Sequence, residues 1–204
     1  SSGIDLIKTD ASDFYVLEDN VRVPSGASYM IENRDTMIKL FPELISKYNV
    51  EDNTNYTKNL SEILKVVAPP KSKKNPNIVL LTPGIYNSAF FEHAFLADKL
   101  GVELVEGKDL RVINKFLNMK TIDGWKKVDV VYRRIDDVFL DPLSFKEDSF
   151  LGVPGLMEVY RNKNVTIANA PGTGISDDKA WYNKILYGRK TNIEKCKNVQ
   201  MPFK

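Results

Sequence analysis

The chain has 204 residues, of which 43% are hydrophobic and 27% are charged, and its formal net charge is only +2. This composition is typical of a globular protein with a hydrophobic core, and the balanced charge excludes the class of basic nucleic-acid-binding proteins. No apolar run approaches the roughly 18 residues that a membrane-spanning helix needs. We therefore expect neither nucleic acid nor a membrane as a partner.

The single cysteine, Cys196, excludes an internal disulfide framework, which agrees with a reducing compartment. The first residues also lack a signal-peptide pattern, so a cytoplasmic location is expected. They lead within two residues into a predicted strand. This abrupt start suggests a piece of a longer protein, so the missing remainder of the same polypeptide is an expected partner.

The first predicted element is a β-hairpin. Its first strand spans residues 3–8, and a polar turn follows at 10–13 before the chain becomes apolar again. A four-residue loop closed by Thr9 and Phe14 would fix the register of the two strands.

This register places Asp5 directly opposite Glu18, and two facing carboxylates repel each other unless a cation lies between them. Glu18 and Asn20 are two residues apart on a strand and therefore share a face. Asp5, Glu18 and Asn20 are thus candidate ligands of a divalent metal ion, although each could instead lie on a solvated strand face. Arg22 follows on the same side, where it could meet an anion.

Helical patterns follow the hairpin. Apolar residues at spacings of three and four predict an amphipathic helix from an N-cap at Asp35 to Tyr48, interrupted at Pro42. Residues 49–59 are polar and predict a loop, and a second short helix is expected through 60–67. Residues 69–76 hold three prolines and a basic cluster, which predicts a solvated linker, with anion binding as the alternative.

From residue 77 the pattern changes to alternating strands and helices, which favours a doubly wound α/β unit with a parallel sheet. A hairpin or excursion is expected between residues 110 and 128. The other expected elements are strands at 78–82, 102–105, 128–132 and 165–168, a helix at 89–100 capped by Asn87 or Ser88, and a short helix at 156–160.

The expected strand ends carry polar or glycine-rich clusters, namely Thr82, Arg133-Arg134-x-Asp136 and residues 169–174. Because the carboxyl ends of parallel strands meet at one edge, these clusters should face a common crevice. Arg133 and Arg134 could clamp a carboxylate or phosphate, and the following aspartates could bind an amine. The alternative is that the arginines form structural ion pairs with the adjacent aspartates.

Other catalytic schemes have little support. His93 is the only histidine and is expected to be a packing or capping residue rather than a base. One histidine and one distant cysteine offer little for zinc binding or nucleophilic catalysis. Gly172-Thr-Gly174 is not a complete dinucleotide-binding or P-loop motif.

The order Asp5, Glu18-x-Asn20 and Arg22-x-Pro24-Ser25-Gly26 resembles the metal-binding end of the ATP-grasp ligase fold. Four further strings in the same order make the sequence similar to the circularly permuted ATP-grasp family up to about Tyr182. They are residues 81–93, 131–137, 151–156 and 169–179. The resemblance implies an ATP- and Mg²⁺-dependent ligase that joins a carboxylate, on a small molecule or peptide, to an amine through an acyl phosphate.

The resemblance also implies roles for individual residues. Asp5, Glu18 and Asn20 would hold Mg²⁺, and Arg22 would be the catalytic cation. The residues expected to bind ATP are Ser25, Gly26, Asp178 and Lys179, and those expected to bind substrate are Asn87, Arg133, Arg134 and Asp136.

Asp177-Asp178-Lys179 resembles the start of the nucleotide-binding subdomain, which circular permutation moves to the end. Residues 5–26 and 176–179 should therefore lie close together in space. The alternative reading of Asp177 and Asp178 is capping of a helix over residues 179–185.

The implied fold class is α/β, with a partial ATP-grasp hairpin and helix unit followed by a Rossmann-like pre-ATP-grasp sheet domain. The implied boundaries are 1–68 for the permuted catalytic part, 69–76 for the linker, 77–175 for the substrate domain and 176–204 for a truncated nucleotide-binding start. The glycine-rich loop and the lysine that should grip the nucleotide phosphates are missing after Lys179. We therefore expect no turnover by this chain alone.

Two rival functions come from other classes. A binding or scaffold module would keep the α/β fold and recruit a peptide or partner protein without chemistry. A nucleotide-sugar or dinucleotide enzyme is disfavoured, because the glycine fingerprint of such proteins is missing.

Overall fold

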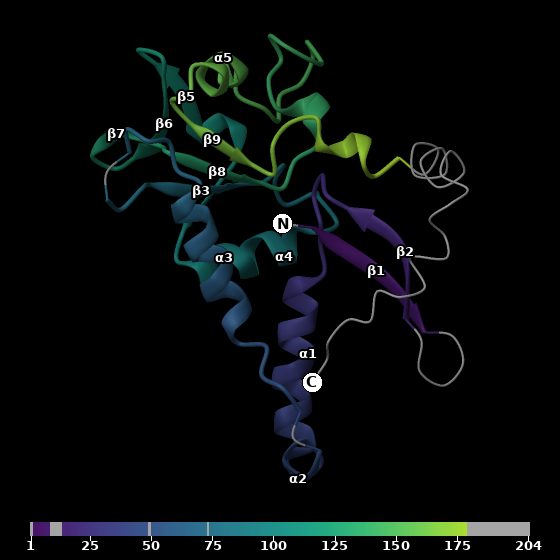
Figure 1. Ribbon diagram of the computed structural model, residues 1–204. Coiled ribbons are helices and arrows are strands. Elements are labelled where there is room, and N and C mark those ends of the chain that lie inside the picture. Colours follow the sequence, from purple (N-terminus) through teal and green to yellow (C-terminus); the bar gives the residue numbers. More distant parts are fainter. Residues whose placement is uncertain (1, 9–13, 49, 73, 179–204) are drawn as a thin grey trace.

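The computed structural model describes residues 2–8, 14–48, 50–72 and 74–178 (Figure 1). It contains a two-stranded hairpin, a four-stranded parallel sheet and a three-stranded antiparallel sheet. The predicted mixed α/β class is confirmed. No described helix is both long and apolar enough to cross a bilayer.

The hairpin pairs β1 (Gly3–Lys8) with β2 (Phe14–Asn20) in antiparallel orientation. Asp5 lies opposite Glu18, as predicted, but the route to this pairing differs. The structure pairs Lys8 rather than Thr9 with Phe14, and a register shift between Asp5 and Leu6 restores the predicted pairing. The pairing begins one residue earlier on β1 than predicted, and the irregularity adds one residue to β2. The two changes cancel, so Asp5 still lies opposite Glu18.

Helix α1 (Ala27–Leu40) begins eight residues before the predicted N-cap at Asp35. Gly26 is the true N-cap, and its φ of 106° is a left-handed conformation that glycine adopts without steric cost. The predicted interruption is confirmed, since Pro42 is the first residue of α2 (Pro42–Lys47), a position that proline tolerates. Helix α3 (Asn55–Val66) begins inside the stretch predicted as a loop.

The parallel sheet has the strand order β4-β3-β8-β9. Its members are β3 (Ile78–Leu81), β4 (Glu103–Val105), β8 (Val130–Arg133) and β9 (Thr166–Ala168), all close to the predicted strands. Strands β3 and β8 are completely buried, which explains their continuous apolar sequence.

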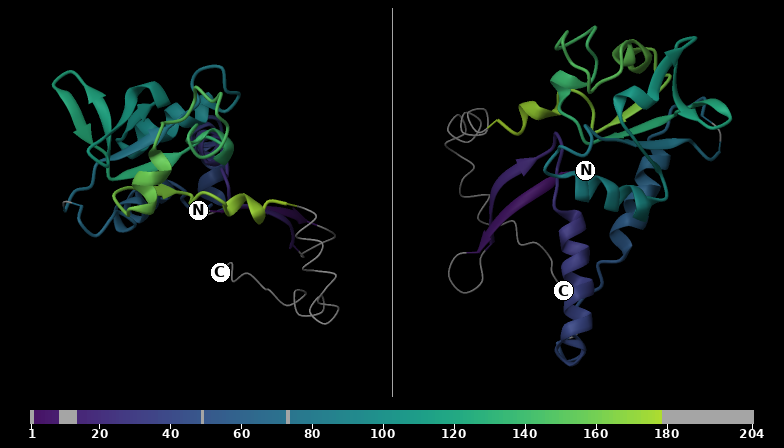
Figure 2. Two further views of the ribbon diagram at one scale, coloured as in Figure 1. Left: turned by 90° about the horizontal axis from the view of Figure 1, so that it is seen from above. Right: turned by 180° about the vertical axis from the view of Figure 1, so that it is seen from behind.

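Both faces of this sheet are covered (Figures 1 and 2). Helix α3 and helix α4 (Phe90–Leu100) pack on one face. The other face packs against the antiparallel sheet of β5 (Leu110–Ile113), β6 (Phe116–Thr121) and β7 (Gly124–Lys127), together with α5 (Leu156–Arg161). Each fully buried leucine or valine in these layers stabilises the fold by roughly 1.5–3 kcal/mol. Three short 3₁₀ helices complete the described elements: η1 (Gly107–Asp109), η2 (Asp137–Phe139) and η3 (Thr173–Ile175).

The buried side of α4 is partly polar. Hydrophobicity favours Phe91 for a buried position, but Phe91 is 50% exposed. The buried residues of α4 are Glu92, His93, Leu96 and Ala97. The helix therefore turns a carboxylate and an imidazole toward the interior, while the ring of Phe91 stays exposed.

Helix α3 precedes the predicted linker at residues 69–76, yet it packs on the sheet that follows the linker. Leu60 and Leu64 of α3 share a buried cluster with Leu80 and Leu96. The division at 69–76 stays a prediction, but this segment connects a helix and a strand that share one hydrophobic cluster. The hairpin and the α1–α2 pair instead extend away from the sheet (Figure 2).

Candidate active site

The carboxyl ends of the central strands meet at one edge of the parallel sheet. Thr82 follows β3, Arg133 ends β8 and Asn169 follows β9, and these three strands are neighbours in the sheet. The prediction that these clusters share one edge is confirmed. A segment from the start of the chain also contacts this edge.

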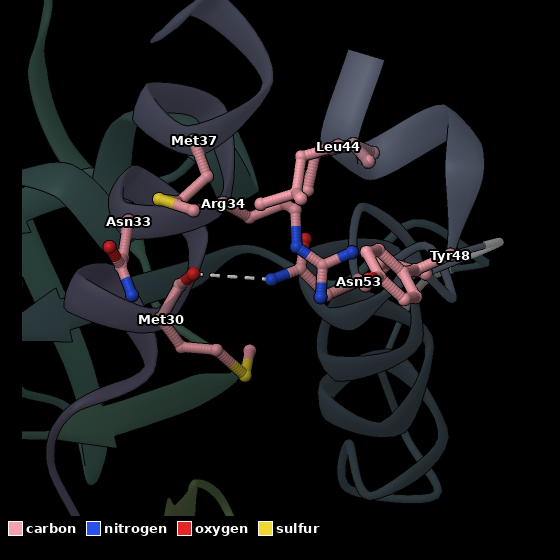
Figure 3. A pocket seen from close by; sticks show the side chains of 9 residues that line it. Met30, Asn33, Arg34, Met37, Leu44, Tyr48 and Asn53 are labelled. Atoms are coloured by element: carbon pink, nitrogen blue, oxygen red, sulfur yellow. Dashed lines mark hydrogen bonds between the residues drawn. The ribbon is translucent and has the colours of Figure 1, made fainter. Parts of the chain in front are cut away.

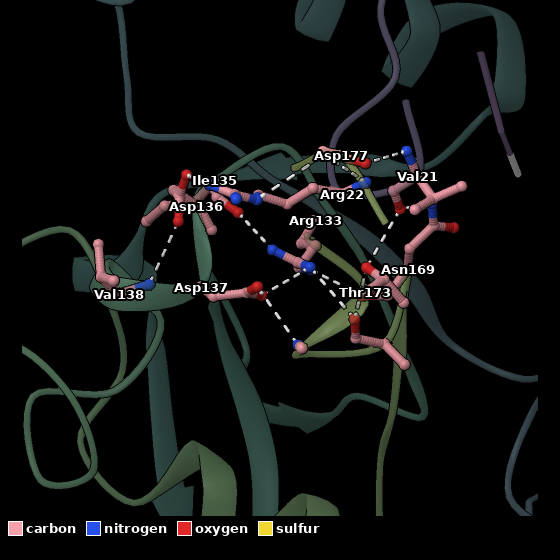
Figure 4. A network of polar contacts seen from close by, with 12 residues as sticks. Val21, Arg22, Arg133, Ile135, Asp136, Asp137, Val138, Asn169, Thr173 and Asp177 are labelled. Carbon is pink, nitrogen blue, oxygen red and sulfur yellow. Dashed lines mark hydrogen bonds and ion pairs between the residues drawn. The ribbon is translucent and has the colours of Figure 1, made fainter. Parts of the chain in front are cut away.

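The segment between β2 and α1, residues 21–26, lies against this edge (Figure 4). The backbone N–H groups of Val21 and Arg22 donate to the two carboxylate oxygens of Asp177 at 2.7 and 3.2 Å. The Val21 carbonyl accepts from Asn169 Nδ2 at 2.6 Å and from Thr173 Oγ1 at 3.1 Å. The predicted proximity of residues 5–26 and 176–179 is therefore confirmed for the residues that the structure describes.

Arg22 lies between two carboxylates. Its Nη1 atom is 2.6 Å from Asp136 Oδ2, and its Nε atom is 3.8 Å from Asp177 Oδ2. The hydrogen bond with Asp136 raises the pKa of Arg22. A Cβ atom at Gly174 would overlap Arg22 Nε, so a larger residue at this position would displace the guanidinium from its place between the two carboxylates. Asp136, a predicted substrate ligand, thus holds the predicted catalytic cation.

Arg133 is surrounded by protein. Its side chain is fully buried and forms an ion pair of 2.7 Å with Asp137. Its three nitrogens also donate to the backbone carbonyls of Asn169, Ile135 and Ala170, at 2.6, 2.9 and 3.3 Å respectively. Burial lowers the pKa of Arg133, and the neighbouring carboxylates oppose this shift. This ion pair is the one expected if Arg133 has a structural role rather than a role in substrate binding.

Arg134 pairs with a residue that the sequence analysis did not select. Its Nη2 atom lies 2.6 Å from Glu92 Oε1, and both side chains are buried. Arg134 also donates to the carbonyl of Pro24. Glu92 lies four residues before Leu96, on the buried side of α4. In the sequence, the signal was a charged residue at a position where the helical spacing favours an apolar one, which indicates an oppositely charged buried partner.

The three predicted metal ligands are placed by the hairpin. Asp5 is opposite Glu18, and Asn20 is opposite Gly3, so all three lie on one face of the two strands. Two carboxylates and an amide oxygen suit Mg²⁺, which prefers oxygen ligands. Within the described ranges, no group of three or more His, Cys, Asp or Glu side chains could hold a metal. The assignment of this site therefore stays a prediction.

The other predicted ligand residues are spread around the sheet edge. Ser25 is exposed, and the N–H of Gly26 donates to Glu92 at 2.6 Å. Asn87 lies in the exposed loop before α4, where its Oδ1 accepts from Ala89 N at 2.9 Å. The N-cap of α4 is Ala89 and it makes no side-chain cap hydrogen bond, so the predicted cap at Asn87 or Ser88 is wrong. Asp178 is exposed, and Lys179 lies outside the described residues, as does the helix expected at 179–185.

His93 is buried, with its Nδ1 atom 2.8 Å from Thr82 Oγ1. This position agrees with the predicted packing role. Burial, together with the nearby charge of Arg134, lowers the pKa of His93 to about 4.

This shift predicts a pH dependence of stability. Between pH 6.5 and about 4 the unfolded chain binds a proton at His93 that the folded chain does not, so stability falls as the pH falls through this range. The expected loss is about 3 kcal/mol. The protection factors of the β3 and α4 amides against hydrogen exchange, which are corrected for the pH dependence of intrinsic exchange, should fall accordingly. The variant His93→Gln should show a flatter dependence of stability on pH. The same dependence in both proteins would contradict the assignment of this effect to His93.

A groove of about 450 Å³ lies away from this edge, between α1, α2 and the segment that follows α2 (Figure 3). Arg34, Leu44 and Tyr48 are among its lining residues, and Asn53 donates to the Met30 carbonyl at 3.2 Å. None of the predicted site residues lines it. The groove and the strand-end site are therefore separate features.

Comparison with known proteins shows which family the sequence matches. A sequence model of the family described as "A circularly permuted ATPgrasp" matches residues 1–187. An uncharacterised protein of Synechocystis sp. is 54% identical over 181 residues, which cover 89% of this chain and 37% of the relative. An uncharacterised protein of Mycobacterium tuberculosis is 49% identical over 184 residues, covering 90% of this chain and 33% of the relative.

A protein of Frankia alni, provisionally named glutamate–cysteine ligase 2-3, is 39% identical over 183 residues, covering 89% of this chain and 21% of the relative. The chain thus spans only between about a fifth and two fifths of the length of these relatives. The family match covers most of the chain and includes the hairpin, the 21–26 segment and the sheet edge. The chain belongs to the circularly permuted ATP-grasp family.

Proposed function

We propose that this chain forms the metal-binding and substrate-side part of an ATP-dependent ligase that joins a carboxylate to an amine. The observation that supports this most is the attachment of the 21–26 segment to the sheet edge through Asp177, Asn169 and Thr173. This contact brings the end of the metal-ligand hairpin, which is the β1–β2 hairpin with the three proposed metal ligands, to the edge of the sheet at which α/β proteins bind ligands.

In this proposal Mg²⁺ would be held by Asp5, Glu18 and Asn20 and would neutralise charge on the ATP phosphates. Arg22 adds a fixed positive charge at the sheet edge, and Asp136 and Asp177 orient its guanidinium. Ser25 and Asp178 are exposed and are proposed to contact the nucleotide. Gly26 would contribute the turn rather than its N–H, because that donor already meets Glu92.

The proposed reaction has two steps. A carboxylate oxygen of the first substrate attacks the γ-phosphorus of ATP, and ADP leaves. The amine of the second substrate then attacks the carbonyl carbon, phosphate leaves, and the amine nitrogen loses a proton. The name of the Frankia alni relative makes glutamate and cysteine the first pair to test, with other amino acids and peptides as further candidates.

The full-length parent protein tests this proposal. With ATP, Mg²⁺ and a mixture of amino acids, we expect ADP release that requires all three components, and no release by the 204-residue chain alone. Titration of Mg²⁺ and a non-hydrolysable ATP analogue into the full-length protein should show binding.

The rival scaffold function has one observation in its favour, which is that Arg22, Arg133 and Arg134 all have carboxylate partners within the protein. It predicts that the full-length protein neither binds the analogue nor releases ADP. Either of these results would overturn the ligase proposal.

A further inference from the structure

Glu92 is a fully buried carboxylate that none of the proposed chemical steps uses. Its Oε1 atom accepts from Arg134 at 2.6 Å. Its Oε2 atom accepts from the backbone N–H of Gly26 at 2.6 Å, from the N–H of Ser28 at 3.3 Å and from Ser28 Oγ at 2.9 Å. A single side chain on α4 therefore contacts both the sheet edge and the first turn of α1.

The contact with α1 replaces a missing cap. The first N–H groups of a helix lack partners within the helix, and an anion there also meets the positive end of the helix dipole. The N-cap of α1 is Gly26, which has no side chain and therefore cannot form the usual side-chain cap. Glu92 supplies the acceptor from a position 66 residues away.

The contact with Arg134 ties the same turn to the sheet. Arg134 follows β8, and it donates both to Glu92 and to the carbonyl of Pro24 in the 21–26 segment. Pro24 and Gly26 are thus held by the two members of one buried ion pair. A tilted ring contact between Tyr29 of α1 and Phe91 of α4, with ring centroids 5.6 Å apart, joins the same two helices.

A buried ion pair of this kind is a poor source of net stability, because removing both charges from water costs about as much as their attraction returns. Its geometry is nevertheless strict, because four donors must reach two oxygens at once. The arrangement therefore fits a role in fixing the position of a segment better than a role in stabilising the fold as a whole.

We propose that Glu92 is a positioning residue of the ligase site: with Arg134 it fixes the 21–26 segment, and through it the metal-ligand hairpin, relative to the carboxyl edge of the sheet. This inference rests on the proposed function for its catalytic meaning. Glu92 touches no substrate in this scheme. It acts through Gly26, Ser28 and Arg134.

The test measures the position of the hairpin directly in the full-length protein. Spin labels at Ile4 of β1 and at Ile122, both exposed, report the distance between the hairpin and the body that carries the sheet, after replacement of the native cysteines. Glu92→Gln keeps the size of the side chain but replaces an accepting oxygen by a donor. We expect a shifted and broadened distance distribution in this variant. The matched control is Glu158→Gln, on the exposed side of α5, which should leave the distribution unchanged.

Activity supplies the second readout. In Glu92→Gln we expect kcat for ADP release to fall about 100-fold, the loss that a misplacement of about 1 Å can cause, while KM for ATP changes much less. A residue that only stabilised the fold would leave both parameters of the folded fraction unchanged. Glu92→Asp, which keeps the charge, should recover part of the rate.

If Glu92→Gln does not fold, Ser28→Ala gives the answer, because it removes one of the four hydrogen bonds and keeps the ion pair. Ser28→Ala should also broaden the distance distribution. An unchanged distribution in the folded Glu92→Gln protein, or in Ser28→Ala when Glu92→Gln does not fold, overturns the positioning role. The distance measurement needs no activity. A broadened distribution in Glu92→Gln, together with no ADP release by the unsubstituted full-length protein, would therefore refute the ligase proposal and not the positioning of the hairpin.

Discussion

Replacement of Glu18 by glutamine is expected to lower ADP release by the full-length protein about 100-fold or more, since a lost metal ligand removes several kcal/mol of charge stabilisation from phosphoryl transfer. Glu18 lies opposite Asp5 in the hairpin, where an anionic pair favours a divalent cation between its members. Folding should change little, because the residue lies at the edge of a two-stranded hairpin rather than in a buried cluster.

The adjacent aspartate provides the matched control. Asp19 lies opposite Ile4, and because neighbouring residues of a strand point to opposite faces, it faces away from Glu18. Asp19→Asn also removes one negative charge and should retain activity within about threefold, which corresponds to less than about 1 kcal/mol. The measurement is the rate of ADP release against Mg²⁺ concentration for both variants. Full activity in Glu18→Gln would refute the metal assignment.

Replacement of Arg133 by methionine is expected to destabilise the α/β unit by about 3 kcal/mol or more, because it leaves Asp137 without its cation and removes the hydrogen bonds that the guanidinium donates to three backbone carbonyls. The side chain is completely buried, so solvent cannot replace the guanidinium. Hydrogen exchange of the β8 and β9 amides in the full-length protein should accelerate by more than about 100-fold if the loss is of this size.

Arg161→Met is the matched control, because Arg161 is an exposed residue in the last turn of α5. It should leave exchange at β8 and β9 unchanged. The two explanations of Arg133 differ in outcome. If Arg133→Met abolished ADP release while exchange at β8 and β9 stayed at the original rate, Arg133 would be a substrate ligand rather than a structural cation.

Local patterns in the sequence were sufficient for much of the fold. The buried run before Thr82, the break at Pro42 and the polar clusters after each strand all have causes within a few residues, such as strand periodicity and the fixed φ of proline. The shared edge followed from a general rule for parallel sheets. The pairing of Asp5 with Glu18 was also predicted, although the actual register reaches it through an irregularity that the sequence did not indicate.

The limits of the predicted helices have a physical reason as well. Helix α1 begins at Ala27 rather than after Asp35, because its N-terminus is capped by a carboxylate from another helix and not by a neighbouring residue. Similarly, Phe91 lies on the exposed side of α4, while Glu92 turns inward to meet Arg134. Hydrophobicity alone favours the phenyl ring for the buried position.

The sequence by itself determined the α/β class and the family, and it supplied the candidate residues for metal and phosphate chemistry. Only the tertiary structure decided which charges meet: Arg22 with Asp136, Arg133 with Asp137, and Arg134 with Glu92. Secondary structure depends on periodicities that repeat every two to four residues. The partner of a charged side chain depends instead on which distant segments pack together, as when Val21 meets Asp177 across 156 positions of the chain.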